Sequence, residues 1–455
     1  MRDSRFDQVC ETVQREMSRL SIPGVAVGVL YGGVENSAGL GVTNVEHSSP
    51  VTRDTLFQIG SITKTFLGTL VMRLVEMGKL DLHAPLKKYL PELKLRDADA
   101  TNHATMFHCL THTGGWDGDY FDDFGRGDDS LARMVAAMEQ LEQLTPLGQV
   151  WSYNNAGFYL AGRVIEVVTG KTFEAAMQEI IFAPLELNSS YFFAEDVMTR
   201  SFAVGHQDLD NKPIVARPWA LARTANPAGG IVSNIADLFR YARFHMGDGT
   251  TQNGARLLAQ ESLVEMCAPR FAATHPESVG LTWYMRDLNG AKIIRHNGGT
   301  NGQVTSLQIL PAHNMAFAIL TNGGHGTLLI NATAKTILEQ YLGIVPQADS
   351  PMEMRAAQLS EYVGDYSARA DDVEVTFRDG ELILQVTNKG GFPTPADPPP
   401  PTQPPPVRAA FYAPDKIFLR DDPYQDYHGE FLRDEKGEIE WLRIFGRVHR
   451  KQAPL

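Results

Sequence analysis

The chain has 455 residues, of which 43% are hydrophobic and 21% charged, and its formal net charge is −13. This length suggests two domains, or one large domain and one small one. Lysine and arginine form no long cluster, and no apolar run reaches the roughly 20 residues that cross a bilayer, so neither nucleic-acid binding nor membrane insertion is expected.

The first twenty residues mix charged and apolar side chains and lack the continuous apolar stretch of a signal peptide. The three cysteines, Cys10, Cys109 and Cys267, lie far apart and form no C-x-x-C pair. Such a pattern is typical of free, buried thiols in a reducing compartment. We therefore expect a cytoplasmic protein.

Apolar side chains follow a helical or a strand period along most of the chain up to residue 345. Helical spacing occurs at 5–20, at 61–77, across much of 100–245 and at 327–342. Strand-like runs occur at 24–30, 36–42, 293–294, 304–310 and 315–320. Because the strands come from both ends and the helices mainly from the middle, we expect an α/β (α+β) domain at 1–345, in which a sheet is flanked by helices and interrupted by a helical insertion.

A different pattern begins after a predicted linker at 346–355. From 373 to 386, apolar and polar residues alternate around a hairpin signal at Asp379-Gly380. Residues 356–455 therefore predict a small antiparallel β-barrel or sandwich. Nine of the 26 prolines fall between positions 393 and 406, where too few apolar side chains are present to pack, so we expect an extended Pro-rich loop there.

Motifs typical of several other catalytic sites and of metal sites are missing from the sequence. No serine stands in a G-x-S-x-G pattern, and no H-E-x-x-H zinc motif occurs. His108 and His112 are four residues apart, but no carboxylate completes a metal-binding set with them. We expect neither a metal nor another cofactor.

Ser61 and Lys64 form an S-x-x-K motif at the start of the predicted helix 61–77. Residues i and i+3 lie on one face of a helix, which places the lysine amine beside the serine hydroxyl. A serine becomes nucleophilic when a base takes its proton, and a lysine can be that base when burial or nearby positive charge keeps it neutral. Taken alone, the motif is also common at ordinary helix starts.

Two further motifs follow in order, Tyr153-x-Asn155 and His296-x-Gly298. Together with S-x-x-K, they resemble the three motifs of the serine β-lactamase and penicillin-binding-protein superfamily, over about residues 5–345. The nearest branch is similar to class C β-lactamases, D-aminopeptidases and family VIII esterases, and the resemblance implies an antiparallel sheet. The C-terminal segment resembles the lipocalin-like barrel appended to some of these enzymes.

The resemblance implies a role for each matching residue. Ser61 would form an acyl-enzyme, while Lys64 and Tyr153 would transfer protons, and either of these two could be the acylation base. The residues implied in substrate binding and in the oxyanion hole are Asn155, His296, Gly298 and Gly299, the last acting together with the backbone N–H of Ser61.

Position 296 separates this chain from relatives that bind the carboxylates of β-lactams or D-Ala. Those relatives usually have Lys-Thr-Gly where this chain has His296-Asn297-Gly298. A histidine is mostly neutral at pH 7 and provides no fixed cation. Six aspartates between Asp117 and Asp129 form an acidic loop, which is either simply solvated or attracts the amine of a substrate.

The resemblance therefore predicts a serine hydrolase that acts through an acyl-enzyme on amide or ester bonds of small substrates, foremost peptides or amides that contain a D-amino acid. The alternatives are a broad-specificity carboxylesterase with weak β-lactamase activity, and a penicillin- or peptide-binding protein without turnover. The expected partner is a small molecule or a short peptide, and the sequence indicates no oligomeric state.

Overall fold

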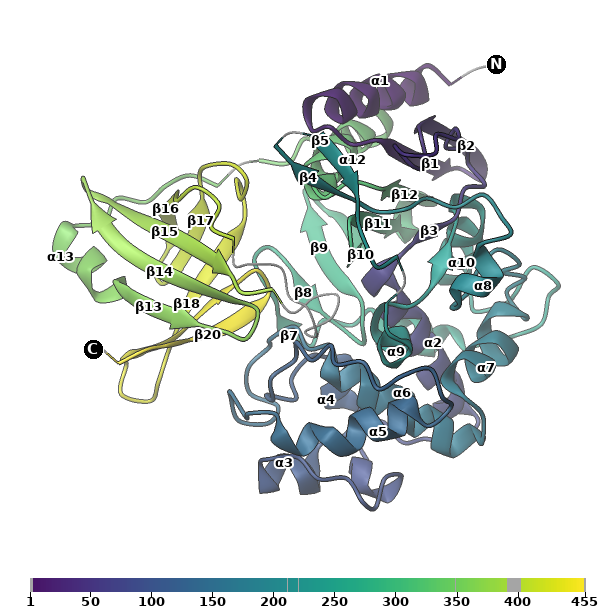
Figure 1. Ribbon diagram of the computed structural model, residues 1–455, viewed down its shortest axis with the longest axis horizontal. Coiled ribbons are helices and arrows are strands. Elements are labelled where there is room, and N and C mark those ends of the chain that lie inside the picture. Colours follow the sequence, from purple (N-terminus) through teal and green to yellow (C-terminus); the bar gives the residue numbers. More distant parts are fainter. Residues whose placement is uncertain (1–2, 211, 220, 348, 391–401, 454–455) are drawn as a thin grey trace.

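The computed structural model describes residues 3–210, 212–219, 221–347, 349–390 and 402–453. It consists of a domain of sheet and helices with a β-barrel beside it (Figure 1). No helix in the described ranges combines the length and the apolar character that a bilayer span requires.

An eight-stranded antiparallel sheet forms the centre of the first domain. Across the sheet, its strands are β2 (Val34–Gly41), β1 (Gly24–Tyr31), β12 (Met315–Thr321), β11 (Gln303–Leu310), β10 (Ala291–Thr300), β9 (Tyr284–Leu288), β8 (Ser278–Val279) and β7 (Phe271–Ala272). The N-terminal strand β1 pairs with β12, and Val27 lies opposite Ile319. The two ends of this domain thus meet in one sheet, which confirms the prediction from the order of the elements.

Helices cover the sheet and fill the middle of the chain. The α-helices are α1 (Ser4–Arg19), α2 (Thr63–Glu76), α3 (Ala98–His103), α4 (Met106–Leu110), α5 (Ser130–Ala137), α6 (Ala156–Thr169), α7 (Phe173–Met177), α8 (Ala194–Val197), α9 (Asn226–Gly229), α10 (Ile235–Met246), α11 (Gln260–Met266), α12 (Gly326–Leu342) and α13 (Ala356–Leu359). Shorter helical turns are η1 (Gly60–Ile62), η2 (Leu86–Lys88), η3 (Met138–Gln140), the π-helical η4 (Gln178–Phe182), η5 (Arg223–Ala225), η6 (Pro311–His313) and η7 (Ser360–Tyr362).

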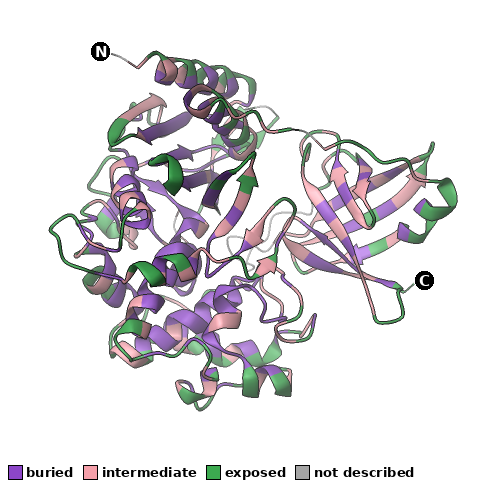
Figure 2. Ribbon diagram, turned by 180° about the vertical axis from the view of Figure 1, so that it is seen from behind, coloured by how far each residue is buried: buried purple, intermediate pink, exposed green. Residues whose placement is uncertain are grey.

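Alternate side chains of the sheet enter two separate hydrophobic cores, because successive residues of a strand point to opposite faces. Val25, Val27 and Val29 of β1 pack in one core with residues of α1 and α12. Ala26 and Leu30 of the same strand join the larger core, which includes residues of α2 and α10. Figure 2 shows the buried strands of the sheet among these helices.

Eight strands close into the C-terminal barrel. They are β13 (Gly364–Ser367), β14 (Asp371–Arg378), β15 (Glu381–Asn388), β16 (Val407–Ala413), β17 (Lys416–Leu419), β18 (His428–Arg433), β19 (Ile439–Ile444) and β20 (Arg447–Lys451). Val373 and Val375 of β14 pack inside with Leu382 and Leu384 of β15, which confirms the predicted all-β pattern. Most of the Pro-rich loop expected at 393–406 lies outside the described residues.

Two small pairings that involve the helical middle are not revealed by the periodicity of the sequence. β4 (His206–Leu209) and β5 (Lys212–Val215) form a hairpin. β3 (Phe57–Gln58) pairs with β6 (Val232–Ser233), so that Phe57 lies opposite Ser233. This second pairing fixes the chain immediately before Ser61.

Candidate active site

The turn between β3 and α2 places Ser61 at a cavity beside strand β10. Gly60 has a φ of +52°, and a Cβ on it would lie 2.6 Å from the backbone nitrogen of Gly299. Both the conformation and the lack of space favour glycine at this position. The absence of a side chain lets the Ser61 turn approach the backbone of Gly299.

The structure brings the two residues of the S-x-x-K motif together. Ser61 lies in η1 and Lys64 in the first turn of α2, and the lysine Nζ donates to the Ser61 Oγ at 3.0 Å. The same Nζ donates to the carbonyl of Ala228 at 2.7 Å. The lysine side chain is fully buried, and its Nζ lies 4.9 Å from the centroid of the Tyr153 ring. Lys64 is therefore held in a single position against the hydroxyl of Ser61.

The surroundings of Lys64 favour its neutral form. Burial lowers its pKa well below the usual value of a lysine, and the positive charge of Arg447 lowers this pKa further. The carboxylate of Asp119 opposes the shift. A lysine with a lowered pKa has a larger neutral fraction near pH 7 and can accept a proton.

Tyr153 completes the group of side chains at Ser61. Burial raises the pKa of its phenol, although a hydrogen bond with the Ser61 side chain acts in the opposite direction. The imidazole of His112 stacks on the Tyr153 ring with 4.4 Å between centroids. The backbone N–H of Tyr153 donates to the carbonyl of Gly446 at 2.7 Å. The phenol is thus fixed by both domains and stays protonated near pH 7.

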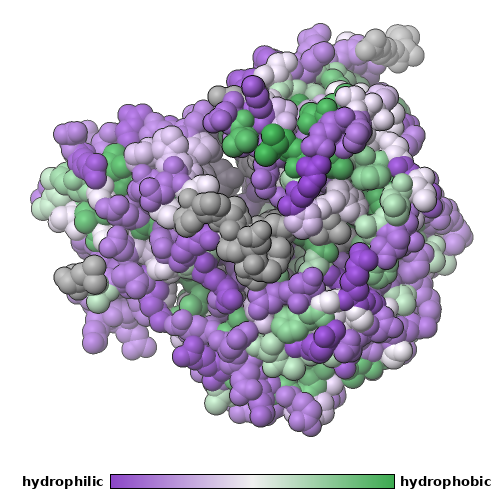
Figure 3. Space-filling view, viewed as in Figure 1, coloured by the Kyte–Doolittle hydropathy of each residue, from purple (hydrophilic) through white to green (hydrophobic). Residues whose placement is uncertain are grey.

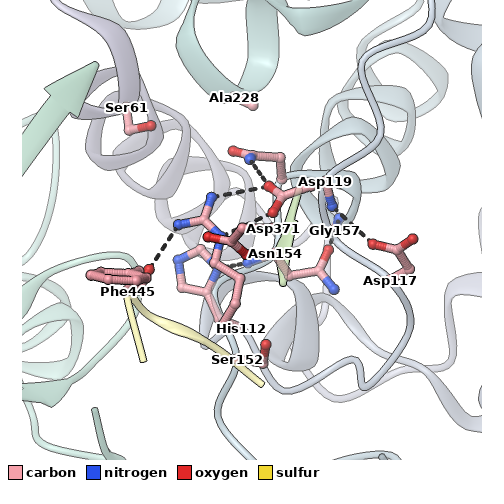
Figure 4. A network of polar contacts seen from close by, with 12 residues as sticks. Ser61, His112, Asp117, Asp119, Ser152, Asn154, Gly157, Ala228, Asp371 and Phe445 are labelled. Atoms are coloured by element: carbon pink, nitrogen blue, oxygen red, sulfur yellow. Dashed lines mark hydrogen bonds and ion pairs between the residues drawn. The ribbon is translucent and has the colours of Figure 1, made fainter. Parts of the chain in front are cut away.

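Asp119 links Asn155, just before α6, to the barrel. Asn155 Nδ2 donates to Asp119 Oδ1 at 3.1 Å, and two nitrogens of Arg447 on β20 donate to the two Asp119 oxygens, each at 3.0 Å. Figure 4 shows Asp119 at the centre of this network, with His112 nearby. The role expected of Asn155 toward Lys64 and the substrate stays a prediction.

Strand β10 carries the third motif along the wall of the cavity. His296 is buried, and burial lowers its pKa to about 3, so its ring is neutral. A Cβ on Gly298 would collide with the backbone carbonyl of Ile59, whereas a Cβ on Gly299 would meet no atom within 4 Å. Gly298 therefore allows close packing against the segment before Ser61, and Gly299 leaves its backbone accessible from the cavity.

The cavity at Ser61 has a volume of about 830 Å³ and is walled by both domains. Trp151 and Tyr284 of the first domain line it, as do Phe445 and Arg447 of the barrel. On the face of the molecule seen in Figure 3, hydrophilic side chains prevail, with hydrophobic ones scattered among them. A small substrate bound at Ser61 would therefore contact the barrel as well as the first domain.

Two arginines of the barrel pair with the acidic loop that the sequence singles out. Arg447 binds Asp119, and Arg369 binds Asp117 at 3.1 Å, while Asp122 of the same loop lines the cavity. Neither arginine is among the site residues that the sequence motifs predict. They lie 328 and 252 residues from their partners, and no motif marks them.

Comparisons with known proteins place the chain among relatives of known type. A family model described as Beta-lactamase matches residues 9–341. Penicillin-binding protein 4 of Amycolatopsis lactamdurans is 33% identical over 357 residues, which cover 76% of this chain and 93% of that protein. Esterase EstB of Burkholderia gladioli is 32% identical over 228 residues, which cover 47% of this chain and 57% of that protein. The crystal structure of SurE with D-Leu has a TM-score of 0.76 at 24% identity and covers 99% of this chain and 100% of that chain, so the likeness in fold includes the barrel.

Proposed function

This chain belongs to the beta-lactamase family and is a serine hydrolase, and we propose that it cleaves amide or ester bonds of small substrates that contain a D-amino acid. Ser61 forms the acyl-enzyme, with Lys64 and Tyr153 as its proton-transfer residues. The observation that carries the proposed acyl-enzyme chemistry is the contact between the buried Lys64 Nζ and the Ser61 Oγ.

The opposite pKa shifts of Lys64 and Tyr153 favour one assignment of the acylation base. Lys64 has a lowered pKa and Tyr153 a raised one, so near pH 7 the lysine has a larger neutral fraction that can accept a proton, and the tyrosine still carries a proton that it can donate. As the Ser61 oxygen bonds to the substrate carbonyl carbon, its proton moves to Lys64 Nζ. The Tyr153 hydroxyl protonates the leaving group and regains a proton from Lys64. Water then attacks the acyl-enzyme with the same two residues as proton carriers.

The backbone around Ser61 provides a place for the negative charge of the tetrahedral intermediate. The close approach of Gly60 to Gly299 supports an oxyanion hole made by the N–H groups of Ser61 and Gly299. Donors directed at a developing oxyanion contribute about 2.7–4 kcal/mol each to transition-state stabilisation. His296 and Asn155 would then contact the substrate on either side of Ser61.

The preference for a D-amino acid rests on two observations. The neutral His296 gives no fixed cation of the kind that β-lactam-binding relatives place there. The likeness in fold to SurE extends over both domains, and SurE has been crystallised with D-Leu. We place the boundary of the first domain at 345 and that of the barrel at 356, with residues 346–355 between them, and the barrel then forms one wall of the substrate site.

A matched panel of D- and L-aminoacyl p-nitroanilides tests this preference. We expect kcat/KM to be at least tenfold higher for the D-enantiomer, with Ser61→Ala as the background control for both. Equal rates, or faster cleavage of the L-enantiomer, would contradict the D-amino-acid preference while leaving the serine hydrolase assignment intact.

Two other functions have specific observations in their favour. The apolar rings in the cavity and the similarity to EstB favour a carboxylesterase, which would cleave short acyl esters faster than any D-aminoacyl amide. The similarity to penicillin-binding protein 4 favours a protein that is acylated without turnover. Mass spectrometry would then show a stable adduct on Ser61, and product release would stop after one equivalent.

A further inference from the structure

Three side chains of the kind that bind transition metals meet at the junction of the two domains, outside the lining of the Ser61 cavity. His275 lies in the loop between β7 and β8, Asp349 lies in the segment before α13, and His428 is the first residue of β18. Within the described residues, this is the group of three whose ligand atoms all lie within 4.8 Å of one another. The group joins three segments that are distant in the sequence.

Asp349 and His428 share a hydrogen bond, which a bound ion would replace, and His275 lies slightly farther away. Asp349 offers one carboxylate oxygen to each imidazole: His428 Nε2 lies 2.6 Å from Asp349 Oδ2, and His275 Nε2 lies 3.9 Å from Asp349 Oδ1. Ligand atoms around a tetrahedral zinc ion are about 3.4 Å apart, given bonds of about 2.0–2.1 Å. Small side-chain rotations would therefore bring all three atoms to one ion.

We propose that His275, Asp349 and His428 form a binding site for a divalent transition metal, with Zn²⁺ as the best match. Imidazole nitrogens select zinc and similar ions over Mg²⁺ and Ca²⁺, which prefer oxygen ligands. Two histidines and one carboxylate leave a coordination position for water. This proposal does not depend on the function proposed for Ser61.

The surroundings hold the two imidazoles in place and leave a path for an ion. The ring of Tyr412 packs against both imidazoles. Its centroid lies 4.9 Å from that of the His275 ring and 5.4 Å from that of the His428 ring. His275 is 42% exposed and lies at the surface end of the group. The positive charge of Lys416 acts on His275, but its Nζ lies 3.8 Å from the carboxylate of Glu430, which offsets its repulsion of a metal ion.

A bound ion would fasten the barrel to the first domain near the active site. His275 is two residues before Glu277, whose carboxylate accepts a hydrogen bond from Arg295 Nε. Arg295 directly precedes His296 in β10. Metal binding would thus stabilise the domain junction that holds the third motif against the cavity.

Isothermal titration of the full-length, chelator-treated protein with Zn²⁺ alone tests the site. We expect one equivalent to bind, with a dissociation constant at least tenfold higher in both His275→Ala and His428→Ala. His313→Ala, which removes an exposed histidine in η6, is the matched control and should bind like the wild type. Because His275 is exposed, its variant is expected to fold even if the His428 variant does not.

A second measurement reports the geometry of the site and its effect on the fold. Co²⁺ in place of Zn²⁺ should give the visible absorption of a protein-bound ion, and Zn²⁺ should raise the Tm of the wild type but not that of His275→Ala. The absence of metal uptake by the wild type would overturn the proposal. Equal uptake by the wild type and His275→Ala would also overturn it.

Discussion

Arg447 of the barrel is expected to set the pH at which the active site becomes functional. Its positive charge lowers the pKa of Lys64, and its partner Asp119 acts in the opposite direction. Arg447→Met removes the cation and leaves the buried carboxylate without its arginine. Both effects raise the pKa of Lys64, and because the lysine must be neutral to accept the Ser61 proton, activity should require a higher pH.

The structure sets a lower limit on the size of this effect. Lys64 Nζ lies 4.9 Å and the Arg447 Cζ 4.7 Å from the centroid of the same Tyr153 ring, so the two charges are at most about 9.6 Å apart. At an effective dielectric constant of about 20, two unit charges at that distance repel each other by about 1.7 kcal/mol. This energy corresponds to a change of about 1.3 in the pKa of Lys64.

The assay is kcat/KM for p-nitrophenyl butyrate as a function of pH. In Arg447→Met, the acidic limb of the profile should move to higher pH by about 1 or more. Arg447→Lys keeps the charge and should leave the limb close to its wild-type position. The double variant Arg447→Met, Asp119→Asn removes both charges, so its limb should return toward that of the wild type.

An unchanged limb in Arg447→Met, or a shift to lower pH, would refute this reasoning. It would mean either that Lys64 is not the group whose deprotonation limits kcat/KM or that the Arg447 charge does not act on it. A loss of activity with no change in the pH profile would assign Arg447 to substrate contact alone.

Three further predictions follow from the site geometry. Lys64→Ala and Tyr153→Phe should each lower the acylation rate by at least about 10²-fold, while the circular dichroism spectrum stays unchanged. A near-normal rate in either variant would mean that the substituted residue takes no part in proton transfer. Gly298→Ala should lower the free energy of unfolding by about 1–3 kcal/mol in denaturant titrations, because the added Cβ meets the Ile59 carbonyl. Gly299→Ala is the control and should unfold like the wild type, because a Cβ there meets no atom within 4 Å. His296→Gln should change the size of kcat/KM but not the pH of its acidic limb, since the pKa of His296 is about 3 and the ring does not titrate near neutrality; a moved limb would contradict this.

The main elements of the fold could be predicted because their side-chain periods are strong. The apolar positions of 5–20 gave α1, and the continuous apolar run at 24–30 gave β1. Strands β7 and β8 have two residues each and show no period, so pattern reasoning could not find them. The hairpin of β4 and β5 is mostly exposed and has no alternation that points to a core.

In the candidate site, too, local contacts could be predicted from the sequence and long-range contacts could not. Ser61 and Lys64 are three residues apart on a helix, so local geometry is enough to predict their contact. The contact between Arg447 and Asp119 depends on how a barrel strand is placed against a loop of the other domain. A single sequence contains no periodic or motif signal for a contact of that kind. For the same reason, the group of His275, Asp349 and His428 could not be predicted from the sequence, because its members belong to three separate segments.

The time course of p-nitrophenyl butyrate hydrolysis by the wild type and by Ser61→Ala, at matched protein concentration, tests the central claim most directly. We predict steady turnover by the wild type and a rate equal to the uncatalysed background for Ser61→Ala. Turnover that persists in Ser61→Ala would contradict the account, because another residue would then have to be the nucleophile.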